Sequence, residues 1–254
     1  MRKTTILVSL LLIAALSLTG CDIVNLFIKT VVGSGELVIE EREVTSFSKI
    51  DAGGGVELLI TKGNNGIEVN AESNLMKYIR TYVEGETLFV EIADTDGGSI
   101  NLQPLEPIRV SVQFSKITGV SLSGGVNLAS EELTVEDMQI DVAMSGGSVA
   151  KIDAVHTDKL NVTLSGGSEL SITEGEVTKQ FIEASGGSVY LADWVQSEVT
   201  ELMLSGGSEA TVWAEETLEI DLSGGSTAYY YGSPNNLNEI GNSGGSDYIS
   251  KGER

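Results

Sequence analysis

Two kinds of residue in this 254-residue chain could carry chemistry: a recurring glycine-rich motif and an excess of carboxylates. A glycine-rich loop can bind phosphate, but such a loop occurs once, leads into a helix and carries a lysine after its glycines. Here the motif recurs, leads into strand-like segments and lacks that lysine, which favours corners of the backbone. Its copies are Ser-Gly-Gly-Ser at 145–148, 165–168, 185–188, 205–208, 223–226 and 243–246, and Ser-Gly-Gly-Val at 123–126.

Three carboxylates recur at one position of the repeat, four residues before the serine: Glu201, Glu219 and Glu239. If the copies stack as strands, these side chains lie one above another, about 4.8 Å apart. Asp221 falls two positions after Glu219 and faces the same way. Calcium accepts several carboxylate oxygens with loose geometry, so one hypothesis is a weak calcium site here. The simpler alternative is a solvated acidic stripe that discourages edge association.

A histidine-dependent enzyme would have to use His156, the only histidine, which stands between Asp153 and Asp158 in a variable segment. We interpret it as an exposed loop residue. One histidine and one cysteine also argue against a zinc site, which draws on several such ligands. We therefore expect no catalytic residues and no cofactor other than the hypothetical calcium.

Aromatic side chains could bind a glycan or a partner protein. Trp194, Trp213 and Phe181 fall at odd offsets of the repeat, which predicts that they face outward. The run "AYYYG" places Tyr229 and Tyr231 outward and the tyrosine between them inward. The alternative is that these are scattered surface aromatics with no ligand.

The N-terminus carries the features of an export signal. A short basic start precedes the apolar run "TTILVSLLLIAALSL", which is too short to span a membrane comfortably. The run ends in Leu-Thr-Gly-Cys at 18–21, which resembles the lipobox of bacterial lipoproteins. That resemblance implies cleavage of residues 1–20 and attachment of a lipid to Cys21, the only cysteine. Asp22 resembles an inner-membrane retention signal of some bacteria, so the sequence leaves open whether the lipid is anchored in the inner or the outer membrane.

The charge narrows the set of partners. The formal net charge is −22, and loss of residues 1–20, which include Arg2 and Lys3, changes it to −24. Such a chain repels nucleic acid and anionic membrane surfaces. We expect no nucleic-acid partner and a membrane association made through the lipid alone.

The elements that position these residues follow from the repeat. The first serines of successive motifs are 22, 20, 20, 20, 18 and 20 residues apart, a period typical of a solenoid. Apolar residues occupy the positions one and three before the serine, with mostly polar residues between them. The column three before the serine comprises Val120, Val142, Val162, Ile182, Leu202, Ile220 and Ile240.

Alternation with a period of two indicates strands that bury one face. It resumes five and seven residues after the serine, so one coil is a strand, a Ser-Gly-Gly corner, a second strand and a variable connection. Parallel pairing of successive coils gives an all-β parallel β-helix of about 20 residues per coil, with the right-handed crossover usual for parallel strands. Stacked corners require glycine for its backbone freedom and leave no room for a Cβ atom.

The preceding part of the chain has strand-like runs without a clean repeat. We divide the chain into a signal peptide (1–20), the lipidated cysteine and tether (21–36), an irregular N-terminal β region that caps the solenoid (37–114) and the Ser-Gly-Gly β-helix (115–254). "AGGGVELLI" at 52–60 is similar to a degenerate copy of the corner unit, and "SNLMKYIRTYV" could form a helical turn. Pro104 and Pro107 are expected to mark the passage to the solenoid.

The stretches "GSGELVIEEREVTSFSKIDAGGGVELLITKG" and "SNLMKYIRTYVEGETLFVEI", followed by the Ser-Gly-Gly coils, resemble the bacterial putative auto-transporter adhesins with a head GIN domain. The resemblance covers about residues 33–250 and implies an all-β solenoid on an envelope lipoprotein. We expect a non-enzymatic, lipid-anchored binding module at the outer membrane or cell surface. The alternatives are a periplasm-facing structural or signalling component and a polysaccharide-active enzyme.

Overall fold

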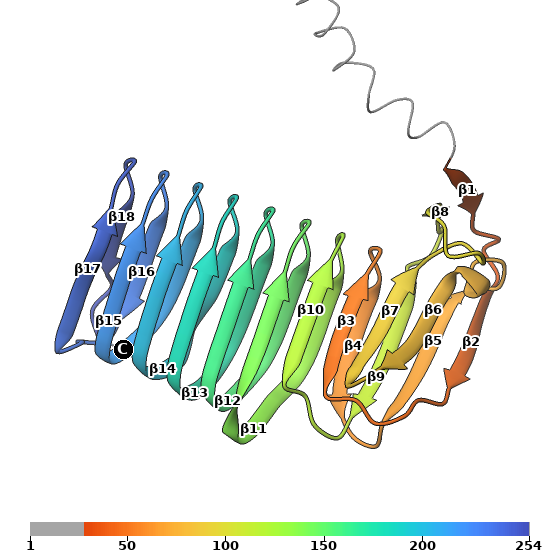
Figure 1. Cartoon of the computed structure of the whole chain (residues 1–254), viewed down its shortest axis with the longest axis horizontal. Coiled ribbons are helices and arrows are strands. Elements are labelled where there is room, and N and C mark those ends of the chain that lie inside the picture. Colours follow the sequence, from red (N-terminus) through yellow and green to blue (C-terminus); the bar gives the residue numbers. More distant parts are fainter. Residues whose placement is uncertain (1–27, 254) are drawn as a thin grey trace, which may run out of the picture.

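The computed structural model describes residues 28–253, of which the side chains of 135–137 are not described. Among these residues the chain forms β-strands and one short 3₁₀ helix, with no α-helix. The strands stack into a rod in which the Ser-Gly-Gly corners form one straight row and the N-terminal strands close one end (Figure 1). The predicted all-β solenoid is confirmed.

The regular part of the rod runs from β10 to β18. Five of its strands are long and bent, so that one strand supplies both sides of a coil and the turn between them. The bounds are β10 Gly119–Ser123, β11 Asn127–Met144, β12 Val149–Leu164, β13 Glu169–Ala184, β14 Val189–Leu204, β15 Glu209–Leu222, β16 Thr227–Tyr231, β17 Asn236–Asn242 and β18 Asp247–Ser250.

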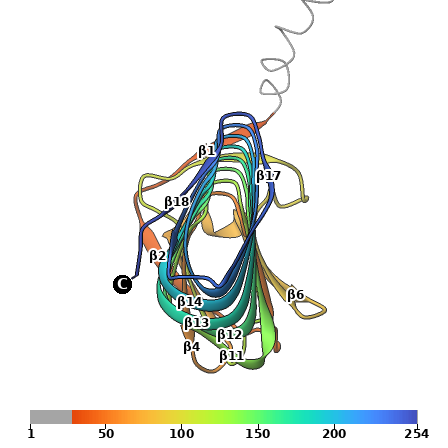
Figure 2. The same ribbon diagram turned by 90° about the vertical axis from the view of Figure 1, so that its left-hand side faces the viewer.

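Seen along its axis, each coil is narrow at the corner and broad at the opposite, rounded edge (Figure 2). The variable connections expected there as loops are β-structure, since Val155 pairs with Gly175 and His156 with Glu176. The reason is that alternation continues through the turn: Val155, Thr157 and Val177 point inward and are buried. His156 is therefore an exposed strand residue, not a loop residue as expected.

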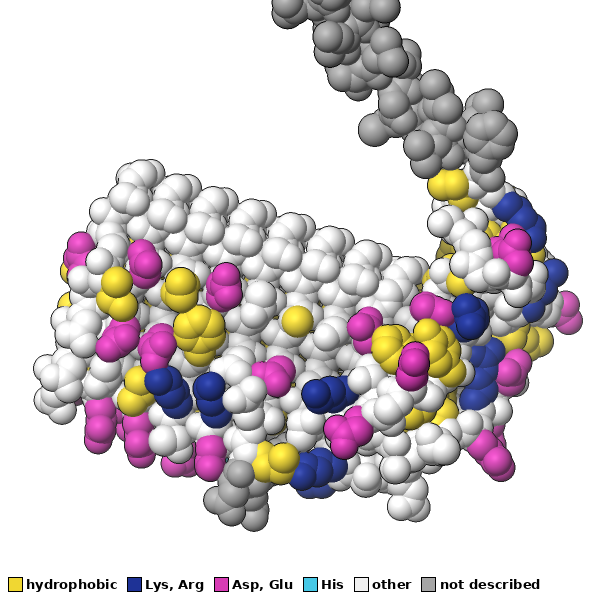
Figure 3. All heavy atoms as spheres, viewed as in Figure 1, with side chains coloured by type: hydrophobic (Ala, Val, Ile, Leu, Met, Phe, Trp, Pro, Cys, Tyr) yellow, Lys and Arg dark blue, Asp and Glu magenta, His cyan; other side chains and the backbone are white. Residues whose placement is uncertain are grey.

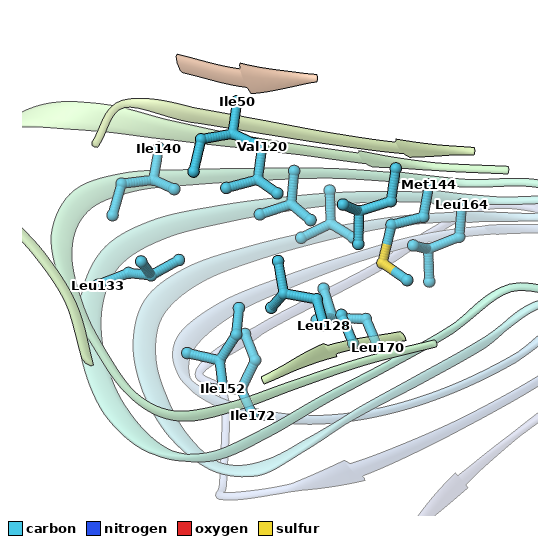
Figure 4. Packing of buried hydrophobic residues seen from close by; sticks show 14 of the residues in the cluster. Ile50, Val120, Leu128, Leu133, Ile140, Met144, Ile152, Leu164, Leu170 and Ile172 are labelled. Atoms are coloured by element: carbon cyan, nitrogen blue, oxygen red, sulfur yellow. The ribbon is translucent and has the colours of Figure 1, made fainter. Parts of the chain in front are cut away.

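The core is a set of vertical columns, one residue per coil. Ile50, Val120, Met144, Leu164 and Leu170 point into the space between the two walls (Figure 4). Burial of such aliphatic side chains contributes about 25 cal/mol per Å² of apolar surface, and it fixes the register because a one-residue slip would turn every column outward.

Each Ser-Gly-Gly-Ser corner contains a hydrogen bond between its own two serines. The second serine is buried, and its hydroxyl donates to the carbonyl of the first, as in Ser188 to Ser185 at 2.8 Å. Both glycines adopt positive φ angles. Only the first lacks room for a side chain: a Cβ on Gly224 would lie 2.9 Å from the nitrogen of Gly206, whereas Gly207 has open space around it. The expectation of crowded corners is thus right for the first glycine of each pair from Gly146 onward, but not for Gly124, where the nearest atom would lie at 3.5 Å.

The N-terminal half is more regular than expected. β3 (Lys49–Gly53) pairs in parallel with β10, and β4 (Glu57–Lys62) with β11, so "AGGGVELLI" is a coil of the solenoid. The other edges of β3 and β4 are covered by β7 (Thr87–Ile92) and β9 (Arg109–Phe114). In the stack, the β3–β4 coil therefore lies between β7 and β9 on one side and β10 and β11 on the other. After β9 the chain crosses this coil to reach β10, so the coils are not stacked in the order of the sequence. Pro104 and Pro107 lie before β9, not at this passage.

Antiparallel strands terminate this end of the rod. β6 (Ile79–Glu84) pairs with β7, while β5 (Gly66–Glu72) pairs with β9 and β2 (Leu37–Arg42) with β5. The expected helical turn is the 3₁₀ helix η1 (Met76–Tyr78), which buries Met76 against the core. β1 (Lys29–Val32) and β8 (Ile100–Gln103) form a separate parallel pair.

The last coil departs from the predicted columns. Glu239 pairs with Ile220 and Gly241 with Asp221, so Ile240 is an extra residue in a bulge. As a result Ile240 is 67% exposed, although its column position predicts burial. The prediction was wrong here because a bulge shifts the side-chain alternation by one residue.

Candidate functional site

A hollowed surface lies on the rounded edge, which we define as residues 154–158, 174–178, 192–198 and 212–216. One outward column crosses it, pairing from coil to coil in the order Thr134, His156, Glu176, Gln196, Trp213 and Tyr231. Residues in such a column lie about 4.8 Å apart. An extended ligand lying along the rod could therefore contact several coils in succession.

A change of coil length breaks the smooth stacking at this edge. Leu191 pairs with Thr211 and Gln196 with Trp213, so β14 has four residues where β15 has one, Val212. Beyond the turn, β15 has two residues, Glu215 and Glu216, where β14 has Glu198. These shifts produce the 18-residue spacing in the sequence. They also leave segment 192–195 with a single residue, Val212, opposite it in the next coil.

Trp194 stands on that projecting segment and is 53% exposed. Its ring centroid lies 6.3 Å from that of the half-buried Trp213, with the two ring planes tilted by 59°. Tyr231 follows Trp213 in the same column. The structure thus brings together three of the predicted aromatic residues at one place.

Two adjoining hollows lie beside this aromatic group, of about 570 Å³ and about 600 Å³. They share His156, Glu176 and Gln196 as walls. The second lies where the pairing of β13 with β14 stops at Ser171–Leu191 and resumes at Gly175–Val195, and Trp194 forms one side of it. Gly175 forms its floor, and a Cβ there would lie 2.2 Å from the carbonyl oxygen of Val155.

The walls of both hollows are acidic. Their carboxylates are those of Asp158, Glu174, Glu176, Glu198 and Glu215. Among the described residues, no lysine or arginine lines either hollow. In the view of Figure 3, acidic side chains also gather along the lower edge of the rod, whereas the row of corners opposite carries no charge. The rounded edge is therefore suited to neutral or cationic groups.

A buried polar cluster supports this edge from inside. Gln180 donates from its amide nitrogen to Ser197 Oγ at 2.9 Å and to Thr200 Oγ1 at 3.1 Å, and its Oε1 accepts from the Tyr190 hydroxyl at 3.1 Å. Ser197 Oγ in turn donates to the carbonyl oxygen of Trp213 at 2.8 Å. Burial raises the pKa of Tyr190, so its hydroxyl stays protonated and able to donate. The cluster ties the backbone under Trp213 to the preceding coil.

The predicted calcium ladder is not assembled as expected. Glu201 and Glu219 do pair in register, but the bulge puts Asn238 in the place predicted for Glu239. Glu239 accepts instead from the Tyr248 hydroxyl at 2.9 Å, and Glu201 forms an ion pair with Lys179. Among the described side chains, which exclude those of 135–137, no three acidic, histidine or cysteine groups converge on a position that could hold a metal ion.

The remaining predicted residues lie apart from the hollows. Tyr229 faces outward in a neighbouring column, with the Lys251 ammonium 4.1 Å from its ring centroid. Phe181 pairs with Glu201 on one wall. Cys21 and Asp22 lie outside the described residues. No described helix has the length and apolar character needed to cross a membrane.

A family model described as "Putative auto-transporter adhesin, head GIN domain" matches residues 46–234, from just before β3 to the turn between β16 and β17. The chain belongs to this head GIN domain family. The resemblance noted from the sequence is thereby confirmed. No curated protein matches the chain.

Solved structures share the head GIN fold. A putative adhesin from Bacteroides fragilis is 21% identical with a TM-score of 0.76, covering 88% of this chain and 98% of that one. A putative lipid-binding protein from Parabacteroides distasonis is 17% identical with a TM-score of 0.69, covering 87% and 100%. A putative adhesin from Parabacteroides merdae is 17% identical with a TM-score of 0.67, covering 87% and 99%. At these identities the likeness concerns the fold.

Proposed function

We propose that this head GIN protein is a lipid-anchored, non-catalytic binding module of the cell envelope that adheres through its rounded edge. The observation that carries the proposal is the pair of adjoining hollows beside Trp194, crossed by a column of outward side chains. A site that continues over several coils suits an extended ligand, because each coil can add one contact of the same kind.

The lack of catalysis is part of the proposal. The acids that line the hollows lie on the outside of a rod, where water reaches them, and an enzyme site ordinarily encloses its substrate. His156 is exposed on that same surface. A polysaccharide-active enzyme is the alternative, and release of shortened chains from a polysaccharide on incubation with the protein would favour it.

The anchor is the predicted lipid on Cys21. Seven residues separate it from β1, whose Lys29 binds the Asp94 carboxylate at 3.1 Å and so fixes the tether to the capped end of the rod. Anchored there, the rod would present its rounded edge away from the lipid. We place the protein at the outer membrane or cell surface; a periplasm-facing structural or signalling component is the second candidate.

The test is lipid labelling combined with protease treatment of intact cells. Metabolic labelling with a palmitate analogue should mark the protein, and Cys21→Ser should remove the label. A C-terminal epitope tag should be lost from unbroken cells, with a periplasmic protein as the protected control. Protection of the tag until the envelope is opened would contradict surface adhesion and favour the periplasmic candidate.

A further inference from the structure

Resting on the binding role proposed above, we propose that the rounded edge binds a polysaccharide of amino sugars whose amines are free and, in mildly acidic solution, positively charged. The ligand would lie along the rod across β12 to β15, with one sugar ring on Trp194 and its ammonium groups facing the carboxylates of the two hollows. The inference combines three observations: the exposed ring of Trp194, the charge of the walls, and a backbone pairing that is interrupted only over residues 172–174 and 192–194.

The exposed ring of Trp194, on the segment where the next coil is shorter, favours a ring-shaped ligand. A sugar ring has an apolar face of C–H groups, which packs against an exposed indole as other apolar surfaces do. Trp194 offers such a face at the rim of the second hollow, and Trp213, tilted against it at 6.3 Å, restricts its position. An ammonium group within about 6 Å of an indole is attracted by the ring as well.

The charge of the walls decides the class of sugar. Five carboxylates line the hollows, and the described residues contribute no lysine or arginine to them. Uronic acids, sulfated sugars and sialic acids would be repelled, while a neutral sugar would leave these charges without a partner. Free amines on successive rings would meet carboxylates on successive coils, since Glu176 and Glu198 stand on neighbouring coils of one groove.

The backbone pairing argues against a peptide ligand. A peptide most readily adds to a sheet through its own backbone at an unpaired strand edge. Glu176 is paired to His156 on one side and to Gln196 on the other, and beside Trp194 the β13–β14 pairing is interrupted only over residues 172–174 and 192–194. The ligand must therefore be bound by side chains, which suits a polysaccharide with many hydroxyl and amine groups.

The proposal is tested by calorimetric titration of the full-length protein in a non-ionic detergent, at a mildly acidic pH at which the sugar amines are protonated and exposed carboxyls are still ionised. The probes are a β-linked glucosamine oligomer, the same oligomer fully N-acetylated, a neutral glucose oligomer and polylysine. We expect the glucosamine oligomer to bind, the two uncharged oligomers to bind at least about tenfold more weakly, and binding to weaken with added salt.

Matched variants connect binding to the site. Trp194→Ala should reduce the affinity for the glucosamine oligomer about tenfold, and Glu174→Gln with Glu176→Gln should do so at low salt. Met203→Ala is the control, because Met203 is a comparably exposed apolar residue, at 44%, on β14 outside both hollows. Circular dichroism should show that all variants keep the β-rich fold.

Three outcomes would overturn the inference. They are equal binding of the charged and N-acetylated oligomers, binding of polylysine as tight as that of the glucosamine oligomer, and full affinity in Trp194→Ala. If one of them occurs while intact cells still lose the C-terminal tag to protease, the ligand class is wrong and the adhesion proposal stands. A protected tag would contradict adhesion whatever the oligomers do.

Discussion

The indole rings of Trp194 and Trp213 lie 6.3 Å apart although the two residues do not pair in the strand register. Trp213 pairs with Gln196, and Trp194 reaches it from the four-residue segment 192–195, opposite which β15 has only Val212. Because β15 is shorter than β14 at this place, the β14 segment that carries Trp194 extends past the regular pairing and brings its ring beside Trp213. The candidate site depends on this relationship.

Because Trp194 and Trp213 are the only tryptophans, their proximity has a spectroscopic signature. We expect an exciton couplet in the circular dichroism of the indole bands. Trp194→Phe and Trp213→Phe should each abolish it, since coupling requires both rings. A couplet that persists in either variant would contradict the arrangement, and Met203→Ala should leave the spectrum unchanged.

The two glycines of one corner should differ in their sensitivity to substitution. Gly225→Ala places a Cβ no closer than 4.0 Å to its nearest neighbour, the Gly244 carbonyl oxygen, at a φ of 80°, and should cost about 1–2 kcal/mol of stability. Gly224→Ala adds contact with the Gly206 nitrogen at 2.9 Å and should cost more. Urea unfolding compares the two. Gly225→Asn serves as the control, because asparagine tolerates this conformation and should recover part of the loss. Equal losses from both alanine variants would refute the crowding argument.

The buried cluster around Gln180 should show strong coupling. Gln180→Leu would match Leu160, which precedes it in the column, yet it leaves the Tyr190 hydroxyl buried without its acceptor. We expect a loss of about 1–3 kcal/mol in unfolding free energy. Adding Tyr190→Phe removes the stranded hydroxyl and should recover most of that loss. Additive losses in the double variant would show that the two side chains act independently.

The buried carboxylate of Glu72 should hold the tether to the cap. Its oxygens accept from the backbone N–H of Gly35 at 2.5 Å and of Leu105 at 2.8 Å. Glu72→Gln replaces one acceptor by an NH₂ group that faces a donor, so we expect a loss of about 1–3 kcal/mol.

Hydrogen exchange provides the measurement for Glu72. The amides of Gly35 and Leu105 should exchange faster in Glu72→Gln, while those of β13 should stay protected. Unchanged exchange at both amides would contradict this role for the carboxylate. Glu68→Gln, on the same strand but exposed, is the matched control.

Two aspartates should make opposite contributions to the pH dependence of stability. Burial, and secondarily the charge of Glu91, raise the pKa of Asp51, so its ionised form is disfavoured in the folded protein and costs stability at neutral pH. The Thr95 backbone N–H, and secondarily Lys29, lower the pKa of Asp94, whose contribution is present at neutral pH and lost as the pH falls.

Neutral variants of these aspartates separate the two effects. Asp51→Asn should raise the unfolding free energy at neutral pH, and Asp94→Asn should lower it. Both differences should shrink in acid, where the wild-type carboxyls are protonated. Thermal melts across the pH range measure the changes, and effects of the same sign at neutral pH would contradict the assignments.

The sequence alone determined the solenoid. The spacing of the Ser-Gly-Gly motifs and the alternation around them are local, repeated many times and mutually consistent, so they predicted the strands, the inward columns and the stacking of Glu201 on Glu219. The same alternation correctly predicted that Trp194 and Trp213 face outward. Such features follow from side-chain period and backbone sterics, which each coil repeats.

Only the tertiary structure decided the features that depend on how unequal coils fit together. The passage from β9 over the β3–β4 coil to β10 is a matter of which strand edges meet, and no local pattern encodes it. The bulge that exposes Ile240 and displaces Glu239 lies in the last coil, where no following coil confines the strand. The 18-residue spacing was visible in the sequence. The place where the shorter coil omits residues was not, because it depends on which inward side chains stay in register with the neighbouring coil. Packing placed the gap beside Trp194, and with it the hollows that form the candidate site.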